Sequence, residues 1–154
     1  RPVVIHAINM VAGNNELPDF VCCIYATAPF LLAQDLKTAF GLLVENQCDF
    51  VFSVGKFASP VQRALKLTKS GRIQMFYPQF RKTRSQDLED AYHDAGQFYF
   101  GQTQAFLQDI NTFSEASVPF IMPSHRVQDI DTVDDWKRAE LLFELLKKKS
   151  MDDQ

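Results

Sequence analysis

The sequence predicts an α/β fold, a mostly parallel sheet flanked by helices. Two short apolar runs, residues 21–25 and 50–54, have the length and composition of buried strands. Between them, apolar residues recur at helical spacing and predict an amphipathic helix that begins at Asp35 and ends near Gln47. A strand, a helix and a strand in this order form a parallel βαβ unit. Ligands bind at the carboxyl ends of strands in such sheets, so the segment that begins at Tyr25 is a candidate site.

Composition limits the classes of function. The 154 residues are expected to form one domain, and 46% hydrophobic residues with 14 Phe suffice for a core. A net charge of −3 argues against a general binder of nucleic acid or of membrane surfaces. The sequence shows neither a signal peptide nor an apolar span of roughly 18 residues. The three cysteines make no disulfide framework and have no metal-ligand spacing, which predicts buried free thiols in a reducing cytoplasm.

A helix is expected before the first strand and a hairpin after the second. Apolar residues near helical spacing predict a helix that stops before Gly13. Alternating residues at 64–68 and 72–75, on either side of a Lys-Ser-Gly turn, predict a half-exposed hairpin. Residues 75–92 are polar, mixed in charge and aromatic, which suits an arm or loop that packs on another subunit.

The rest of the chain alternates again between strands and helices. Strands are expected at 97–100 and 119–122, with a helix at 103–110 between them. Thr132 is expected to begin the final helix, and Asp135 follows three residues later. The predicted buried stripe of this helix consists of Trp136, Ala139, Leu142, Phe143 and Leu146.

Two aspartates form the clearest candidate for a metal site. Asp129 and Asp131 lie on the same side of an extended segment, close enough to bind one cation. Taken by themselves, they are more simply explained as polar residues that lead into a helix, with Asp131 near its positively polarised start. His125 is near enough to support a metal ligand. The basic cluster at 81–84 suits a carboxylate or phosphate ligand, or else a solvated face with salt bridges.

Three motifs in series carry a resemblance to a known family. They are Tyr25-Ala26-Thr27-Ala28-Pro29, then Arg84-Ser85-Gln86-Asp87-Leu88 with Tyr92-His93-Asp94-Ala95-Gly96-Gln97-Phe98-Tyr99, and finally Asp129-Ile130-Asp131-Thr132. In order and spacing they resemble the acylneuraminate cytidylyltransferases, which activate nine-carbon acid sugars as CMP conjugates. The resemblance covers nearly the whole chain. It implies a Rossmann-like, nucleotide-diphospho-sugar-transferase-like fold with a protruding dimerisation arm at about 62–95.

Departures from the family pattern narrow the expected substrate. Tyr25, Ala28 and Ala95 stand where sialic acid members usually have Gln, Ser and Asn. This combination resembles the branch that acts on pseudaminic acid, for flagellin glycosylation or surface polysaccharide in bacteria. Family members also carry an N-terminal strand and a glycine- and basic-rich loop that holds the CTP phosphates. The chain starts after that loop in the family pattern, so the resemblance implies a domain that is incomplete at its N-terminus.

The resemblance also implies a reaction and the residues that perform it. The anomeric hydroxyl of the sugar attacks the α-phosphorus of CTP and pyrophosphate leaves, with Mg²⁺ held by the catalytic residues Asp129 and Asp131. The expected partners are CTP, an acid sugar and a second copy of the chain in a homodimer, with no nucleic acid and no membrane. The substrate-binding residues implied in this way are Tyr25, Thr27, Arg84, Gln86, His93 and Asp94.

Two alternatives stay open at the level of sequence. Without the phosphate-holding loop, the chain can be a catalytically silent fragment that dimerises or binds sugar. It can also serve a different acid sugar, such as sialic, legionaminic or deoxyoctulosonic acid, although Tyr25 and Ala28 weigh against sialic acid.

Overall fold

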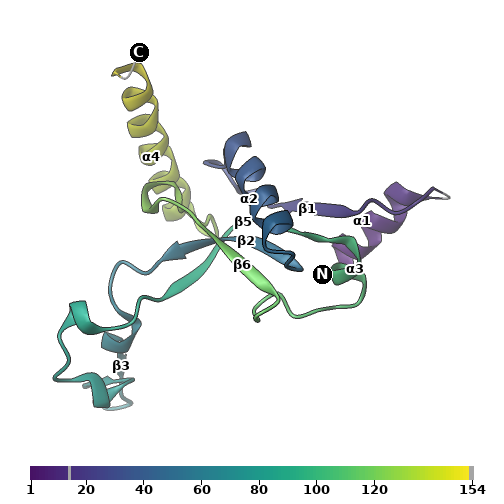
Figure 1. The fold of residues 1–154 in the computed structure, drawn as a ribbon. Helices are drawn as coiled ribbons and strands as arrows, with labels where there is room; N and C mark the ends of the chain where they lie inside the picture. The colour runs from purple at the N-terminus through teal and green to yellow at the C-terminus, as the bar shows by residue number, and fades with distance from the viewer. Residues whose placement is uncertain (14, 153–154) are drawn as a thin grey trace.

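A four-stranded sheet forms the centre of the molecule (Figure 1). The computed structural model describes residues 1–13 and 15–152. The strands of the sheet lie in the order β1, β5, β2, β6. Their bounds are Phe20–Ile24 for β1, Tyr92–Gln102 for β5, Phe50–Lys56 for β2 and Ser117–Ile121 for β6. Strand β2, predicted from its apolar run, is buried along residues 50–55, which places it at the core.

The sheet is mixed, so the prediction of a mostly parallel sheet is wrong in part. Strands β2 and β6 pair in parallel, whereas β5 pairs antiparallel with both β1 and β2. Strands β1 and β2 therefore run in the same direction, as the βαβ prediction required, but β5 lies between them. Local sequence patterns do not encode this insertion, because it depends on contacts between residues far apart in the chain. The α/β class itself is confirmed.

Helices cover both faces of the sheet. Helix α2 (Ala33–Glu45) lies on one face and buries Ala39 and Leu43 against Val51 of β2. On the other face, Phe50 of β2 packs in a cluster with α1 (Pro2–Ala12) and α3 (Thr103–Leu107). The side chains of neighbouring residues in a strand point to opposite faces, so β2 contributes to both cores.

The helix boundaries largely follow the predictions. Helix α1 ends at Ala12, just before Gly13, and α2 begins at Ala33, two residues before the predicted start. Helix α3 is shorter than predicted. It ends at Leu107 because Asp109 adopts the left-handed conformation, with φ of 55°, and thus ends the helical path before Ile110.

A buried ion pair connects α2 to the loop that follows β6. The guanidinium of Arg126, in the short helix η4 (Ser124–Arg126), donates to both carboxylate oxygens of Asp35 at 2.5 and 2.9 Å. The side chains of Asp35 and Arg126 are only 8% and 13% exposed. Asp35 also accepts a hydrogen bond from the backbone N–H of Leu32 at 2.9 Å, which satisfies a free donor at the helix start.

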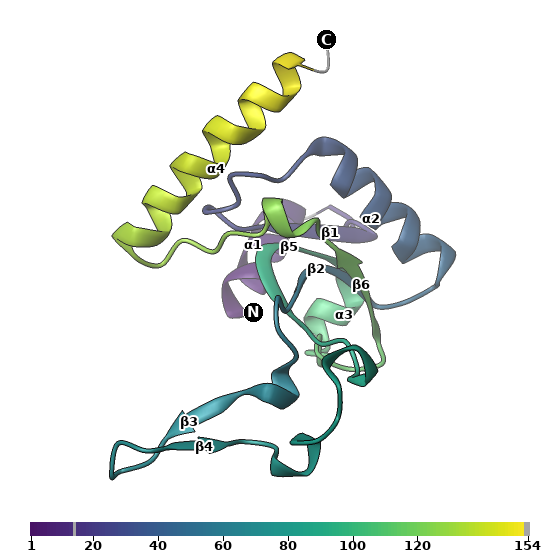
Figure 2. The same cartoon turned by 90° about the vertical axis from the view of Figure 1, so that its left-hand side faces the viewer.

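Residues between β2 and β5 project from the sheet as an arm (Figure 2). The predicted hairpin is present as β3 (Leu65–Leu67) paired antiparallel with β4 (Ile73–Met75). The rest of the arm contains three short 3₁₀ helices, η1 (Val61–Arg63), η2 (Pro78–Phe80) and η3 (Ser85–Asp87). The guanidinium of Arg63 donates to the backbone carbonyls of Arg81 and Thr83, which joins the two sides of the arm near its base.

Helix α4 (Val133–Asp152) begins where the sequence predicts but buries the predicted stripe only in part. Thr132 caps it: its hydroxyl accepts a hydrogen bond from the Asp135 N–H at 3.2 Å. The helix extends away from the sheet in Figures 1 and 2, and Trp136 and Phe143 are 55% and 54% exposed. Ala139 is buried and Leu142 and Leu146 are half-buried. The predicted core position of Trp136 is wrong, because Trp136 and Phe143 line a pocket beside Phe30 instead of closing onto it. Among the described residues, no helix is long and apolar enough to cross a membrane.

Removing the charge of Asp35 is expected to destabilise the fold. Asp35→Asn leaves the buried Arg126 guanidinium without its anionic partner, so the free energy of unfolding should fall by about 3–5 kcal/mol. Asp134→Asn breaks an exposed ion pair with Lys137 and should change the free energy of unfolding by less than about 0.5 kcal/mol. Urea unfolding of both variants measures the two values, and equal losses would contradict the role of the buried pair.

The same variant should show how the pair depends on pH. Burial would raise the pKa of Asp35, but hydrogen bonds from Arg126 and from the Leu32 N–H hold this pKa below its ordinary 3.8. The pair therefore stabilises the fold above that value, and its contribution is lost as pH falls through the lower folded pKa. Accordingly, the difference between the parent protein and Asp35→Asn should shrink below pH 3.8.

Candidate active site at the carboxyl edge of the sheet

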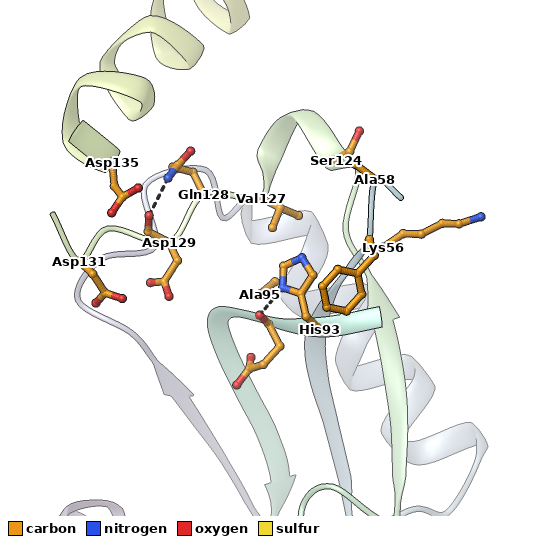
Figure 3. Close-up of a pocket in the computed structure, with 12 residues that line it drawn as sticks. Lys56, Ala58, His93, Ala95, Ser124, Val127, Gln128, Asp129, Asp131 and Asp135 are labelled. Carbon is orange, nitrogen blue, oxygen red and sulfur yellow. Dashed lines mark hydrogen bonds between the residues drawn. The ribbon is translucent and has the colours of Figure 1, made fainter. Parts of the chain in front are cut away.

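A pocket of about 470 Å³ lies at one edge of the sheet (Figure 3). Three chain segments meet there: the end of β2, the beginning of β5 and the loop between β6 and α4. Because β5 runs antiparallel to β2, its first residues lie at the same edge as the last residues of β2. The lining residues are Lys56, Phe57, Ala58, His93, Asp94, Ala95, Ser124, Val127, Gln128, Asp129, Asp131 and Asp135.

Four of the predicted site residues come together in this pocket. His93 and Asp94 lie on β5, and Asp129 and Asp131 lie in the loop before α4, yet all four line one cavity. Figure 3 shows the carboxylates of Asp129 and Asp131 on the same side of the opening. The two motifs, separated by more than thirty residues in the sequence, therefore form one acidic surface.

The other predicted residues lie outside the lining of the pocket. Tyr25 and Thr27 follow the end of β1, and the ring of Tyr25 lies 5.7 Å from that of Tyr99. Arg84 and Gln86 lie on the arm, where Arg84 forms an exposed ion pair with Asp87 at 3.1 Å. His125 is exposed in η4 and does not line the pocket.

A β-bulge sets the direction of β5 where it enters the pocket. The pairing register of β2 and β5 shifts between Phe52 and Val54. At that point the buried hydroxyl of Ser53 accepts hydrogen bonds from the backbone N–H groups of Gln97 and Phe98, at 3.1 and 3.2 Å. Gly96 adopts a φ of +61°, a conformation that favours glycine. The bulge thus replaces ladder hydrogen bonds with side-chain ones and turns the start of β5.

Hydrogen bonds fix the carboxylate of Asp94 in this turn. The backbone N–H of Gly96 donates to one oxygen at 2.9 Å, and the hydroxyl of Tyr99 donates to the other. The backbone carbonyl of Asp94 lies 2.8 Å from Nδ1 of His93, whose ring packs against Phe57 at 4.9 Å between centroids. Asp94 and His93 are therefore held in place before any ligand arrives.

The carboxylates of the pocket repel one another. Burial has the largest effect and raises the pKa of Asp94, while the hydrogen bond from the Gly96 N–H lowers this pKa. The charge of Asp129 raises it further, and His93 has the smallest effect and lowers it. The pKa of Tyr25 is also raised, first by burial and then by Asp94, with smaller effects of Cys23 and Asp129. A cation bound between these groups would relieve this repulsion.

The donor set fits a hard divalent cation. Asp129 and Asp131 offer carboxylate oxygens, which Mg²⁺ prefers, on an exposed loop. One oxygen of Asp129 accepts from the Ile130 N–H at 3.0 Å, which orients this carboxylate. Among the described residues, no group of three or more His, Cys, Asp or Glu side chains is arranged to hold a metal ion. Mg²⁺ commonly completes its shell with water and phosphate oxygens, so two carboxylates suffice.

Four residues with polar side chains line the pocket but were not predicted as site residues. Lys56, the last residue of β2, pairs with Asp90 at 2.5 Å. Asp135 caps α4, and a hydrogen bond from the Thr132 hydroxyl is the main reason that its pKa is lowered. The side-chain amide of Gln128 donates to the backbone carbonyl of Asp129 at 2.6 Å, and Ser124 begins η4. Lys56 carried a signal in the sequence, since it comes two residues after the strand predicted at 50–54.

Comparison with known proteins identifies relatives. Two proteins of Campylobacter jejuni, from serotypes O:2 and O:23/36, are both named pseudaminic acid cytidylyltransferase and are 42% identical to the chain. The matches span 143 and 142 residues, which are 93% and 92% of this chain and 62% and 61% of those proteins. The chain is a homologue of pseudaminic acid cytidylyltransferases. These homologues confirm the resemblance seen in the three motifs.

A third relative is a longer Helicobacter pylori protein. It is named pseudaminic acid cytidylyltransferase and UDP-2,4-diacetamido-2,4,6-trideoxy-beta-L-altropyranose hydrolase, and it is 37% identical over 113 residues. This match covers 73% of this chain and 22% of the H. pylori protein. No family model matches the chain. The chain spans about three-fifths of the length of its C. jejuni relatives.

A substitution at Gly96 should disturb the entry of β5 into the pocket. Gly96→Ala places a side chain at a φ of +61°, which should cost about 1–2 kcal/mol of unfolding free energy. The new Cβ would lie 3.5 Å from the Asp129 carboxylate, an ordinary contact, so backbone strain should account for the loss. Gly41→Ala in helix α2 meets no atom within 4 Å and should stabilise by about 0.5–1 kcal/mol. Thermal unfolding of both variants tests these opposite signs.

Proposed function

We propose that this protein transfers a cytidylyl group from CTP to a nine-carbon acid sugar, with pseudaminic acid as the preferred acceptor. The products are the CMP-sugar, for flagellin or surface glycan modification, and pyrophosphate. The observation that carries the proposal is the convergence of Asp94, Asp129 and Asp131 in one pocket at the carboxyl edge of the sheet. The 42% identity to the C. jejuni relatives supports the same reaction and sugar.

The reaction forms one phosphorus–oxygen bond and breaks another. The anomeric oxygen of the sugar bonds to the α-phosphorus of CTP. The bond from that phosphorus to the oxygen that bridges the α- and β-phosphates breaks, and pyrophosphate leaves with this oxygen. The proton of the sugar hydroxyl passes to solvent. Asp129 and Asp131 would hold Mg²⁺, which when bound offsets the negative charge that develops on the phosphoryl oxygens. Asp94 and His93, fixed by hydrogen bonds, would orient the sugar beside the aspartates.

We propose that the arm completes the site of a second copy in a homodimer. Arg84 and Gln86 lie on the arm, away from the pocket of their own chain, with Arg84 exposed. The arm also exposes large apolar side chains, among them Leu67, Ile73 and Phe76. Apolar side chains on a projecting segment suit a protein interface, and an arginine suits recognition of the sugar carboxylate.

The place of action is proposed to be the cytoplasm. Cys22, Cys23 and Cys48 are free thiols, which accords with a reducing compartment. A catalytically silent fragment that dimerises or binds sugar is the second candidate function. The observation that favours it is the exposed apolar surface of the arm, with Leu67, Ile73 and Phe76, which suits an interface whether or not the site is active.

Pyrophosphate release tests the proposed reaction. The longest product of the gene should release pyrophosphate from CTP in the presence of Mg²⁺ and pseudaminic acid, and more slowly with sialic, legionaminic or deoxyoctulosonic acid. Asp131→Ala should lower turnover by at least about a hundredfold while the protein stays folded, because it removes a proposed metal ligand. Asp134→Asn, an exposed change on α4, serves as the control. A folded protein that is silent with every sugar would favour the inactive fragment or a sugar outside the panel.

Sedimentation tests the proposed dimer. Phe76→Ala combined with Phe80→Ala removes aromatic rings from the arm and should shift a dimeric parent protein towards monomer. Leu141→Ala combined with Leu145→Ala removes exposed apolar side chains from α4 instead and should leave the dimer intact. A parent protein that sediments as a monomer at all concentrations would refute the dimer.

A further inference from the structure

Gln97 is a polar residue in the core just below the pocket. Its side chain, on β5, is fully buried. The side-chain amide nitrogen donates to the backbone carbonyl of Ala95 at 3.1 Å and to that of Gln128 at 3.4 Å. The amide oxygen has no hydrogen-bond partner among the described residues.

The two carbonyls belong to different walls of the pocket. Ala95 lies on β5, whereas Gln128 immediately precedes Asp129 in the loop that follows β6. Gly96, between Ala95 and Gln97, faces the Asp129 carboxylate so closely that a Cβ on Gly96 would lie 3.5 Å from its oxygen. One amide group therefore connects the strand to the loop at the point where the loop presents Asp129.

Stability alone does not account for this residue. A buried amide oxygen without a donor loses its hydrogen bonds to water and gains none in return. An unbranched apolar side chain of similar volume, such as Met, would fill the same space without that cost. Gln97 thus resembles buried polar groups that fix the positions of neighbouring segments without adding stability.

We propose that Gln97 is a positioning residue, which holds the Asp129 loop against β5 so that Asp129 faces the metal-binding position. This inference rests on the proposed function, because it takes Asp129 and Asp131 as the ligands of Mg²⁺. Gln97 does not touch the ligand. It acts through the backbone of Gln128, and without it the loop loses its side-chain link to β5.

The test compares two Gln→Met variants on the same strand. Gln97→Met should melt at the same or a higher temperature than the parent protein, yet bind Mn²⁺ about tenfold more weakly in the presence of CTP. Binding is measured from the signal of free Mn²⁺ in electron paramagnetic resonance. Gln102→Met is the matched control: the Gln102 amide also donates to a backbone carbonyl, that of Cys48 at 3.0 Å, but at the far end of β5. It should bind Mn²⁺ like the parent protein.

A second variant keeps the test decisive if Gln97→Met does not fold. Gln97→Asn retains the amide but is one methylene shorter, so it cannot reach both carbonyls and should also weaken Mn²⁺ binding. Unchanged binding in either folded variant would overturn the inference, as would an equal loss in Gln102→Met. If neither variant folds, Gln97 is a determinant of folding and the inference fails. A parent protein that binds no Mn²⁺ would instead overturn the proposed function.

Discussion

The geometry of the site depends on the buried ion pair between Asp35 and Arg126. These residues are 91 positions apart in the sequence, and their contact joins the start of α2 to the loop that carries Asp129 and Asp131. Arg126 also donates to the backbone carbonyl of Phe30 at 3.3 Å, which adds the segment after β1 to the same junction. Removing one partner would leave the other charge buried and unpaired, which strongly destabilises a fold. The ion pair therefore holds the start of α2 against the loop that follows β6.

The antiparallel strand β5 supplies the other half of the arrangement. It enters the sheet between β1 and β2 with its first residues at the edge where β2 ends. The bulge at Ser53 and the positive φ of Gly96 then place Asp94 opposite the aspartate loop. A strand inserted in the parallel direction would deliver its first residues to the opposite edge, away from the loop. The mixed topology therefore brings two acidic motifs into one pocket.

Local patterns in the sequence predicted elements well and their arrangement poorly. The apolar run of β2, the periodicity of α2 and the hairpin of the arm all have local causes, and the structure contains each of them. The place of β5 and the partner of Asp35 depend on contacts across the chain, which periodicity does not encode. Trp136 illustrates the same limit, because it lies on a real helical stripe but the described residues leave it 55% exposed.

The residues of the candidate site were also predicted only in part. Spacing alone allowed Asp129 and Asp131 to be either metal ligands or ordinary residues before a helix, and the motif resemblance decided which was expected. That resemblance also named His93 and Asp94, which the structure places in the same pocket. The second motif contains Gln97, but neither approach gave it a role, because the role depends on hydrogen-bond partners that only the structure shows.

We propose that the loop held by Arg126 presents Asp129 and Asp131 to the metal of a nucleotide complex. The most direct measurement is the anomalous scattering of Mn²⁺ in crystals of the longest gene product grown with CTP. We expect one strong peak between the carboxylates of Asp129 and Asp131, in contact with the phosphates of CTP. Bound CTP with Mn²⁺ elsewhere, and no peak at these two residues, would contradict it.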